Sequence, residues 1–558
     1  MNLYQFRYYS DTYNVPLRNL NIAFVVLQLF LFVGDPLLGW YTDTAHTRWG
    51  RRRPFIGLFG PALMVIVFLG MYPIFDSSQV VLTIWFGTSY MLNNLVTLLY
   101  LSPYQALGIE LTLDSRERNK LFGVTQTLYQ LGVVVSTALP EAMVALHPER
   151  REVYMWFGAT AGALGVITML TLVVFVKERS DFVVETPTPL IAGMIRTLQN
   201  PAFATLLVTI TLLNCQPYYL VILPYWVKYS LQLDSFWQAA IMTTYMTGAF
   251  VFIPFWTWLS SRTGKKKTYL ISMAVAIIAF SAIVLVKPGQ KAAAIAVSFC
   301  AGASGLSLNA YNFLFQSLLA DIIEYDELRT GVRREAQYAN MVQVFNALTS
   351  VMSVSLPLFI MDSVGFHANE TQDDKVRTTI SLLLGPGCAA YVLLAAISFM
   401  FYPITTLVHE RIREGLLMHA SGKPALDPVT KEMVLAPGAA TSVVPASDAW
   451  FLDNFFGFEL SFALLRDGSS RVAPLGLIKL VVFWLVLTAG TTTGSIIWIF
   501  QDPSRYLEVG SFIAMCSLAV FIFNLCRISP ALKFAKSPLP HAIVYHHVLH
   551  GNNLVANQ

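Results

Sequence analysis

Long apolar stretches, each of about 20 residues, recur along most of the chain and are separated by short polar loops. A stretch of this length crosses the hydrocarbon core of a bilayer, which is ~30 Å thick, as a single α-helix. The pattern therefore predicts an all-α protein with about a dozen membrane-spanning helices. We expect them at residues 19–41, 54–74, 80–108, 121–145, 152–176, 202–227, 236–259, 268–286, 292–320, 337–363, 378–405, 474–500 and 506–528.

The composition agrees with a multi-pass integral membrane protein. Of the 558 residues, 55% are hydrophobic and 13% are charged, whereas soluble domains carry about 25% charged residues. The formal charge of +4, with no basic segment interleaved with aromatic residues, argues against a nucleic-acid partner. The five cysteines lie singly in apolar stretches, without the spacing of a metal site or a disulfide framework. The sequence has no phosphate loop, Ser–His constellation or HExxH motif, so we expect neither an enzyme nor a cofactor.

The loop charges predict the orientation in the membrane. Alternate loops hold 19 and 8 Lys and Arg residues, and the positive-inside bias places the richer set in the cytoplasm. Residues 407–472, which include several prolines, are then cytoplasmic and are expected to be mostly irregular. Asn369 begins an Asn-Glu-Thr triplet on the outer side, where it is a candidate glycosylation site in a eukaryotic host. Whether the plasma membrane or an organelle membrane holds the protein is left open.

Two loops share a pattern at corresponding places in the two halves of the chain. Residues 48–53 read Arg-Trp-Gly-Arg-Arg-Arg after one predicted span, and residues 262–267 read Arg-Thr-Gly-Lys-Lys-Lys after another. Two spans later in each half, residues 110–118 and 321–334 both run from carboxylates to basic residues. A six-helix unit repeated parallel to itself is typical of transporters that rock two bundles about a central site.

These charged loops predict a cytoplasmic gate that locks one side of the protein in a single conformational state. Glycine permits a tight turn between adjacent helices, and the cations can approach helix C-termini and opposed carboxylates. The predicted gate residues are Asp43, Arg48, Gly50, Arg51, Arg52, Arg53, Glu110, Arg262, Gly264, Lys265, Asp321, Arg333 and Arg334. The alternative is that the cations only set the topology, which explains their sign but not their matched spacing.

Three motifs, within residues 35–55, 103–118 and 320–335, resemble those of the glycoside–pentoside–hexuronide:cation symporters of the major facilitator superfamily. The first reads Asp-Pro-Leu-Leu-Gly-Trp-Tyr-Thr-Asp at 35–43 and Arg-Trp-Gly-Arg-Arg-Arg-Pro-Phe at 48–55. The resemblance extends from about residue 8 to about residue 420. It implies the major facilitator fold, with two pseudo-symmetric six-helix bundles around a central cavity, and cation-coupled uptake of a sugar or glycoside.

The resemblance also suggests how the chain is divided. Its first helix is expected to be truncated, because the chain begins where that helix should be ending, and a C-terminal two-helix hairpin lies outside the resemblance. The expected parts are an N-terminal bundle at 1–176, a central cytoplasmic loop at 177–201, a C-terminal bundle at 202–406, a cytoplasmic segment at 407–472, an extra transmembrane hairpin at 473–528 and a cytoplasmic tail at 529–558.

The cation site of the family is incomplete in this sequence. The resemblance places the two carboxylates of that site at Leu31 and Asp35, its amide at Gly34 and its hydroxyl at Leu98. Sodium requires a cluster of oxygen ligands, whereas a proton requires one buried carboxylate. We therefore expect Asp35 to couple transport to protons, or transport to be uncoupled. The alternative is that Asp35 is an interfacial residue that orients the following turn.

Neutral groups also replace the charged sugar-binding positions of the family, which align with Leu101, Gln126 and Ala347. Amide side chains remain on several helices, and they offer both donors and acceptors to a neutral polyhydroxy ligand. The predicted cavity residues are Gln105, Gln126, Gln130, Asn214, Gln216, Asn309, Asn312, Gln316, Asn340, Gln343 and Asn346. The alternative role for each amide is a hydrogen bond between helices.

The leading hypothesis is a secondary transporter of a neutral sugar or glycoside. A transporter of a lysolipid or other amphiphile is the first alternative, and a membrane sensor or scaffold that transports nothing is the second. The partners expected on the leading hypothesis are a small-molecule substrate, the lipid bilayer and a coupling proton.

Overall fold

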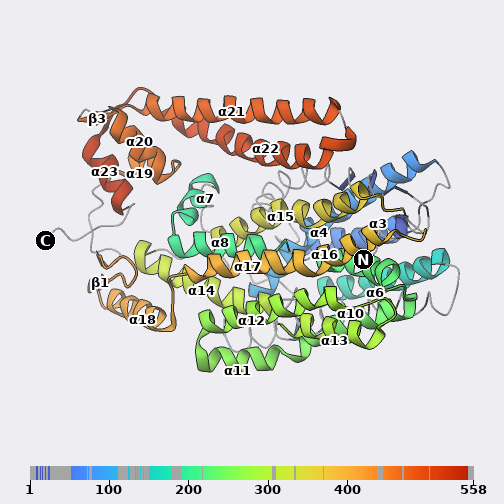
Figure 1. Ribbon diagram of the computed structural model, residues 1–558. Helices are drawn as coiled ribbons and strands as arrows, with labels where there is room; N and C mark the ends of the chain where they lie inside the picture. Colours follow the sequence, from blue (N-terminus) through green and yellow to red (C-terminus); the bar gives the residue numbers. More distant parts are fainter. Residues whose placement is uncertain are drawn as a thin grey trace.

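The computed structural model describes residues 8–10, 13, 15–16, 19–20, 23–24, 52–71, 73, 78–110, 124–125, 128, 132, 135, 139, 143, 150–176, 190–215, 218–304, 310–331, 335–367, 370–436, 444–467, 470–501 and 503–550. The predicted spans 19–41 and 121–145 therefore lie largely outside the described residues. Within the described part the fold is helical, and most of the long helices run side by side (Figure 1).

The N-terminal half contains α3 (Arg53–Met71), α4 (Gln79–Glu110) and α6 (Arg150–Phe175). The C-terminal half contains α7 (Leu190–Leu198), α8 (Pro201–Leu213), α9 (Tyr218–Tyr225), η1 (Trp226–Ser230), α10 (Ser235–Val251), α11 (Ile253–Thr263), α12 (Lys265–Ser281), η2 (Ala282–Leu285), α13 (Lys291–Ala303), α14 (Ala310–Thr330), α15 (Glu335–Ser363), α16 (Asp374–Leu382), η3 (Leu383–Gly387) and α17 (Cys388–Met400). Among the described residues, seven helical segments are long and apolar enough to cross a membrane.

The predicted spans agree with these helices in position, but several consist of consecutive pieces. Spans 54–74, 80–108, 152–176 and 337–363 correspond to the single helices α3, α4, α6 and α15. Span 378–405 instead comprises α16, the π-helical turn η3 and α17, with Pro386 inside η3. Proline has no amide hydrogen to donate to the preceding turn, so the helix widens locally at this position.

Matching contacts in the two halves support the internal repeat. In the N-terminal half α3 packs against α6, and Arg53 Nε donates to the carbonyl of Val173 at 3.1 Å. In the C-terminal half α12 packs against α17, and Lys266 Nζ donates to the carbonyls of Met400 and Tyr402 at 2.9 and 2.6 Å. Each cation lies in the first turn of a helix and binds carbonyls at the C-terminal end of the neighbouring helix, where the helix dipole favours positive charge.

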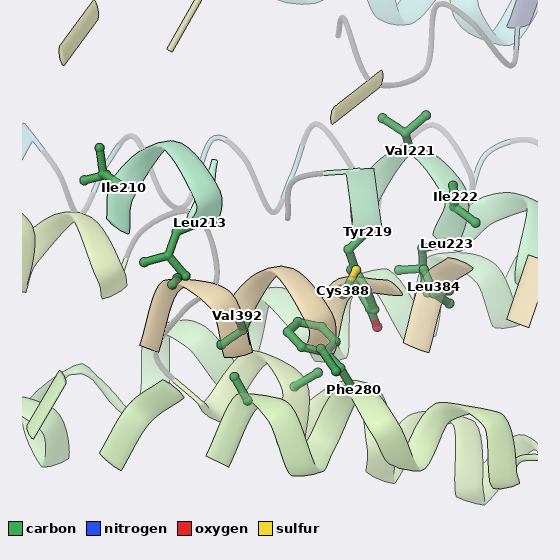
Figure 2. Packing of buried hydrophobic residues seen from close by; sticks show 14 of the residues in the cluster. Ile210, Leu213, Tyr219, Val221, Ile222, Leu223, Phe280, Leu384, Cys388 and Val392 are labelled. Atoms are coloured by element: carbon green, nitrogen blue, oxygen red, sulfur yellow. The ribbon is translucent and has the colours of Figure 1, made fainter. Parts of the chain in front are cut away.

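The C-terminal bundle has a continuous apolar core. Leu213 of α8, Tyr219 of α9, Phe280 of α12, and Cys388 and Val392 of α17 all belong to this cluster of buried side chains (Figure 2). The ring of Tyr219 also stacks on that of Tyr245 in α10, with centroids 4.6 Å apart. The core therefore fixes α8 and α9 against three other helices.

The segment at 407–472, which the loop charges predict to be cytoplasmic, is more ordered than the sequence suggested. It contains α18 (Thr406–Ala420), β1 (Ala425–Leu426), β2 (Met433–Val434), α19 (Ala446–Leu452) and α20 (Gly457–Asp467). The expectation that 407–472 is mostly irregular is therefore wrong. Local caps explain the difference, because Thr405 accepts a hydrogen bond from the first turn of α18. Asp427 likewise accepts from the amides of Val429 and Thr430 and so closes the turn between the antiparallel strands β1 and β2.

The last part of the chain forms a module around two long helices. The predicted spans 474–500 and 506–528 correspond to α21 (Pro474–Gln501) and α22 (Pro503–Lys533), which pack along each other (Figure 1). At the end of this hairpin, β3 (Arg471–Val472) pairs with β4 (Leu539–Pro540), and α23 (His541–His550) packs on α20. A second apolar core, separate from that of the bundle, holds α19 to α23 together.

A buried ion pair anchors α20 to α22. The guanidinium of Arg527 binds the carboxylate of Glu459, with both side chains about 1% exposed, and donates to the carbonyl of Asn454 at 2.8 Å. The same guanidinium lies over the rings of Phe455 and Phe523, at 4.9 and 5.3 Å from their centroids. Because the pair is removed from water, its partners must satisfy each other.

The module also contacts the bundle. Arg196 of α7 forms an ion pair with Asp453, whose carboxylate also lies 3.5 Å from Nε2 of His547. Gln199 donates to the carbonyl of Phe455, and α22 packs against α15. The module is therefore tied to α7, which belongs to the predicted central loop between the two halves.

Replacing Arg527 with Met leaves Glu459 as a buried carboxylate without its partner. We expect the protein in detergent to lose about 3–5 kcal/mol of stability in this module, measured as a lower thermal unfolding midpoint. The double variant Arg527→Met/Glu459→Leu removes both charges and should regain most of the loss. Equal stability of the single variant and the parent would contradict this role of the pair.

Candidate cavity and cytoplasmic ion-pair network

The structure brings two of the predicted cavity amides into contact. Nδ2 of Asn214, at the end of α8, donates a hydrogen bond to Oδ1 of Asn346 on α15, and both side chains are half-buried. Five other predicted amides lie on helices that the structure describes, although the positions of their side chains are not described. They are Gln105 on α4, Asn312 and Gln316 on α14, and Asn340 and Gln343 on α15. Four further predicted amides lie outside the described residues, namely Gln126, Gln130, Gln216 and Asn309.

The amide pair lies where a membrane helix is interrupted. α8 ends at Leu213, Asn214 caps it by donating its backbone amide to the carbonyl of Ile210 at 2.8 Å, and α9 begins at Tyr218. At 1.5 Å per residue, Asn214 lies about 20 Å along the helix from Pro201, the first residue of α8. The interruption therefore falls inside the predicted span 202–227, away from both of its ends. Discontinuous helices at such depths commonly form the substrate sites of transporters.

An amide group has four hydrogen-bonding sites, and the bond between Asn214 and Asn346 uses one site on each. Two residues near Asn214 in the chain, Leu213 and Tyr219, are buried in the apolar core. A half-buried amide pair in such surroundings can exchange its internal bond for bonds to a ligand hydroxyl. The geometry suits a neutral polar group better than a charged one.

An ion-pair network occupies the predicted gate in the C-terminal half. Lys265 Nζ, at the start of α12, lies 2.6 and 2.8 Å from the two carboxylate oxygens of Asp321 on α14. Nε2 of His409 on α18 lies 3.3 Å from Asp321 Oδ1 and 3.0 Å from Glu324 Oε2. The network therefore joins α12, α14 and α18 at one end of the bundle.

The carboxyl of Asp321 is only 5% exposed. Burial raises the pKa of Asp321 from its ordinary value, while the charge of Lys265 and its hydrogen bond act in the opposite direction. A raised pKa favours the protonated form, so the attraction between Lys265 and Asp321 weakens when the pH falls toward that value. The ion pair therefore weakens under acidic conditions, as Asp321 takes up a proton.

His409 and Asp427 are parts of this region that sequence reasoning missed. Asp427 accepts a hydrogen bond from the hydroxyl of Tyr325 at 3.1 Å and lies 3.6 Å from Nε of Arg329. Burial raises the pKa of Tyr325, so its phenol keeps the proton that it donates. Both residues lie beyond the last predicted span of the bundle, where no periodicity or motif distinguishes them from loop residues.

The structure describes some of the other predicted gate residues and not the rest. Arg52 is half-buried, Arg53 binds the C-terminus of α6, and Arg262 lies over the ring of Trp258 rather than in the ion-pair network. Glu110 is the last residue of α4, and its side chain is not described. The predicted residues that lie outside the described part are Asp35, Asp43, Arg48, Gly50, Arg51, Arg333, Arg334 and the candidate glycosylation site Asn369.

Gly264 makes the tight turn that its position in the repeat suggested. Its φ of 84° and ψ of 152° belong to a region that is essentially restricted to glycine. A Cβ at this position would also collide with Oγ1 of Thr406, the first residue of α18. The turn therefore places Lys265 at the start of α12 and lets α18 approach closely.

Replacing Lys265 with Met should open the cytoplasmic end, because Asp321 loses its closest cation. We expect a cysteine introduced at Ser317, one turn before Asp321, to react about tenfold faster with a membrane-impermeant thiol reagent applied from the cytoplasmic side, as for a shift of ~1.4 kcal/mol. Lys267→Met, which removes an exposed cation from the same turn, is the matched control. Equal labelling rates in the two variants would argue against a latch at Lys265.

Gly264→Ala should destabilise the protein by more than the ~1–3 kcal/mol of backbone strain alone, because the new methyl group also meets Thr406. Gly422→Ala is a matched control, since Gly422 has a φ of 73° but no described atom lies within 4 Å of the place that its new methyl carbon would take. Thermal unfolding in detergent measures both. A smaller loss for Gly264→Ala than for Gly422→Ala would show that Thr406 does not restrict the turn.

Comparison with known proteins tests the resemblance. The family model described as MFS/sugar transport protein matches residues 1–406. The glucuronide carrier protein homolog of Escherichia coli is 24% identical over 420 residues, covering 72% of this chain and 88% of the relative. Sodium-dependent lysophosphatidylcholine symporter 1 of Gallus gallus is also 24% identical, over 440 residues, covering 70% of this chain and 80% of the relative.

A solved structure of a mutant of the nucleoside transporter NupG has the same fold. Its TM-score is 0.52 at 15% sequence identity, with 71% of this chain and 95% of that chain covered. The all-α major facilitator fold and the multi-pass membrane location predicted from the sequence are thereby confirmed. The protein is a transporter rather than an enzyme, and it belongs to the MFS/sugar transport family, which includes the glycoside–pentoside–hexuronide:cation symporters.

Proposed function

We propose that this transporter carries a neutral sugar or glycoside by alternating access, either coupled to protons or uncoupled. The hydrogen bond between Asn214 and Asn346 is the observation that carries the proposal. It places two amides at the interruption between α8 and α9, deep in the predicted span, where a polyhydroxy ligand can take over their donors and acceptors.

The absence of charge at the corresponding family positions supports a neutral ligand. Leu101 and Ala347 stand where the family has a carboxylate and a lysine that bind sugar, and Ala347 directly follows Asn346. A buried charge without a partner costs much more than a buried amide, so a site built from amides selects against charged substrates. The relative named as a glucuronide carrier supports a sugar-derived substrate class.

The ion-pair network supports the alternating-access part of the proposal. Lys265 and Asp321 join α12 to α14, and His409 extends the contact to α18. Such contacts stabilise one conformation of a transporter and must break when the cytoplasmic side opens. Asp35, which lies outside the described residues, is the proposed coupling carboxylate.

A lysolipid or related amphiphile is the second candidate substrate. The lysophosphatidylcholine symporter relative is as similar in sequence identity as the glucuronide carrier homolog and covers nearly the same share of this chain. The apolar surroundings of the amide pair would suit an acyl chain, with the amides facing the polar part of such a ligand.

Uptake into proteoliposomes tests the proposal with a panel of labelled neutral sugars, glycosides and lysolipids under imposed pH or sodium gradients. We expect a neutral sugar or glycoside to be taken up. We expect Asn346→Ala to weaken its apparent affinity roughly tenfold, because a bound hydroxyl loses its partner. Asp35→Asn should abolish any accumulation driven by the pH gradient.

Thr349→Val is the matched control for Asn346→Ala. Thr349 lies one turn further along α15, and among the described residues its hydroxyl bonds two carbonyls of its own helix, at 2.9 and 3.1 Å. Uptake of lysolipids alone would favour the second candidate. The lack of uptake for every compound and gradient would contradict both candidate substrate classes.

A further inference from the structure

Helix α20, in the C-terminal module, is apolar on two opposite faces. One face, with Leu460, Ala463 and Leu464, is buried in the core of the module. The other carries Phe458, Phe462 and Leu465, which are 64%, 54% and 84% exposed and follow a helical spacing of four and three residues. A helix with water on its outer side carries polar residues there, so this stripe indicates an apolar partner.

The position of α20 places this stripe at the end of a membrane-spanning segment. The guanidinium of Arg466, in the last turn of α20, lies against the backbone of Gly476 in the first turn of α21. From Pro474 to Trp498, α21 is long and apolar enough to cross a bilayer. Helix α20 therefore lies at the depth where the hydrocarbon core gives way to the headgroups.

Aromatic rings connect the stripe to the surface of the hairpin. Phe458 stacks on Phe456 with ring centroids 5.6 Å apart, and Phe456 lies 5.9 Å from the ring of Phe523 on α22. Val520, one turn before Phe523 on the adjoining face of α22, is 42% exposed, as expected for a side chain that faces lipid. The apolar surface thus continues from a membrane-spanning helix onto α20, which favours the bilayer over a second protein as the occupant.

Among the described residues at the base of the hairpin, the exposed charges that are not paired within α20 are positive. Asp467 is paired with Arg466 at 2.8 Å, so these two neutralise each other. The remaining cations at the base of the hairpin, all exposed, are Arg471, Lys479, Lys533 and Lys536. The pairing of β3 with β4 holds the segments that carry them together, since Arg471 is in register with Pro540.

We propose that α20 lies in the headgroup layer of the cytoplasmic leaflet, with its apolar stripe at the acyl-chain boundary, and that these cations bind anionic phospholipid headgroups. Amphipathic interfacial helices bind membranes in this way, by apolar burial combined with attraction to anionic lipid. The buried pair of Arg527 and Glu459 holds α20 at the required angle to α22. Through Asp453 and Arg196, the lipid-bound module is also connected to α7 of the central loop.

The depth of α20 is tested with the full-length protein in nanodiscs. A nitroxide label is attached to Phe462→Cys in a background whose five native cysteines are replaced by alanine. We expect collisions with oxygen to dominate over collisions with a water-soluble nickel chelate. Leu417→Cys is the matched control, because Leu417 is 73% exposed on α18, away from the hairpin. Equal access of the chelate to both labels would overturn the proposal and would fit a protein partner instead.

The preference for anionic lipid is tested by titrating phosphatidylglycerol into phosphatidylcholine nanodiscs and following the thermal unfolding midpoint. We expect Lys536→Gln to raise the phosphatidylglycerol fraction needed for half of the stabilisation about fivefold. Lys423→Gln, which removes an exposed cation from the turn after α18, should leave it unchanged. Equal stabilisation by the two lipids, or equal responses of the two variants, would overturn the charge-based part of the proposal.

Discussion

The bilayer imposes the constraint on which this structure depends, because its hydrocarbon core offers no hydrogen bonds to the backbone. The chain responds by forming helices, and where a helix is interrupted, as after Leu213, the interruption lies inside the bundle. The side chain of Asn214 then meets that of Asn346 rather than lipid. The same constraint that forces helices on the chain therefore also brings these two amides together inside the bundle, at the site that we propose for the substrate.

The ends of the helices are subject to a related constraint, since their last carbonyls need partners. Arg53 and Lys266, one position apart in the aligned repeat, supply these partners between corresponding helix pairs, each joining the start of one helix to the end of another. Lys265, next to Lys266, binds a carboxylate instead. The adjacent residues Lys265 and Lys266 therefore have different roles. Lys266 holds two helices of the bundle together, whereas Lys265 forms an ion pair that must break if the protein works by the proposed alternating access.

The C-terminal module extends the same chemistry beyond the two bundles. Its core is small, and one fully buried ion pair, with aromatic rings around the guanidinium, connects its surface helix to the hairpin. Because Glu459 is neutralised inside the module by Arg527, it does not compete with lipid headgroups for the exposed cations. The ion pair between Arg196 and Asp453 connects the module to α7, which belongs to the predicted central loop.

The sequence by itself determined the membrane class, the positions of the described spans, the repeat and the family, because hydrophobic length and charged loop motifs are local properties of the chain. It also indicated Gly264 as a turn and Lys265 and Asp321 as members of one charged region. It did not reveal His409, Asp427 or the pairing of Asn214 with Asn346, and it wrongly suggested an irregular segment at 407–472. The missed polar contacts join residues 85, 102 and 132 positions apart, and only the packing of helices against one another decides which polar groups meet. The helices and strands within 407–472 depend instead on local caps and turns, which an estimate from the number of prolines overlooked.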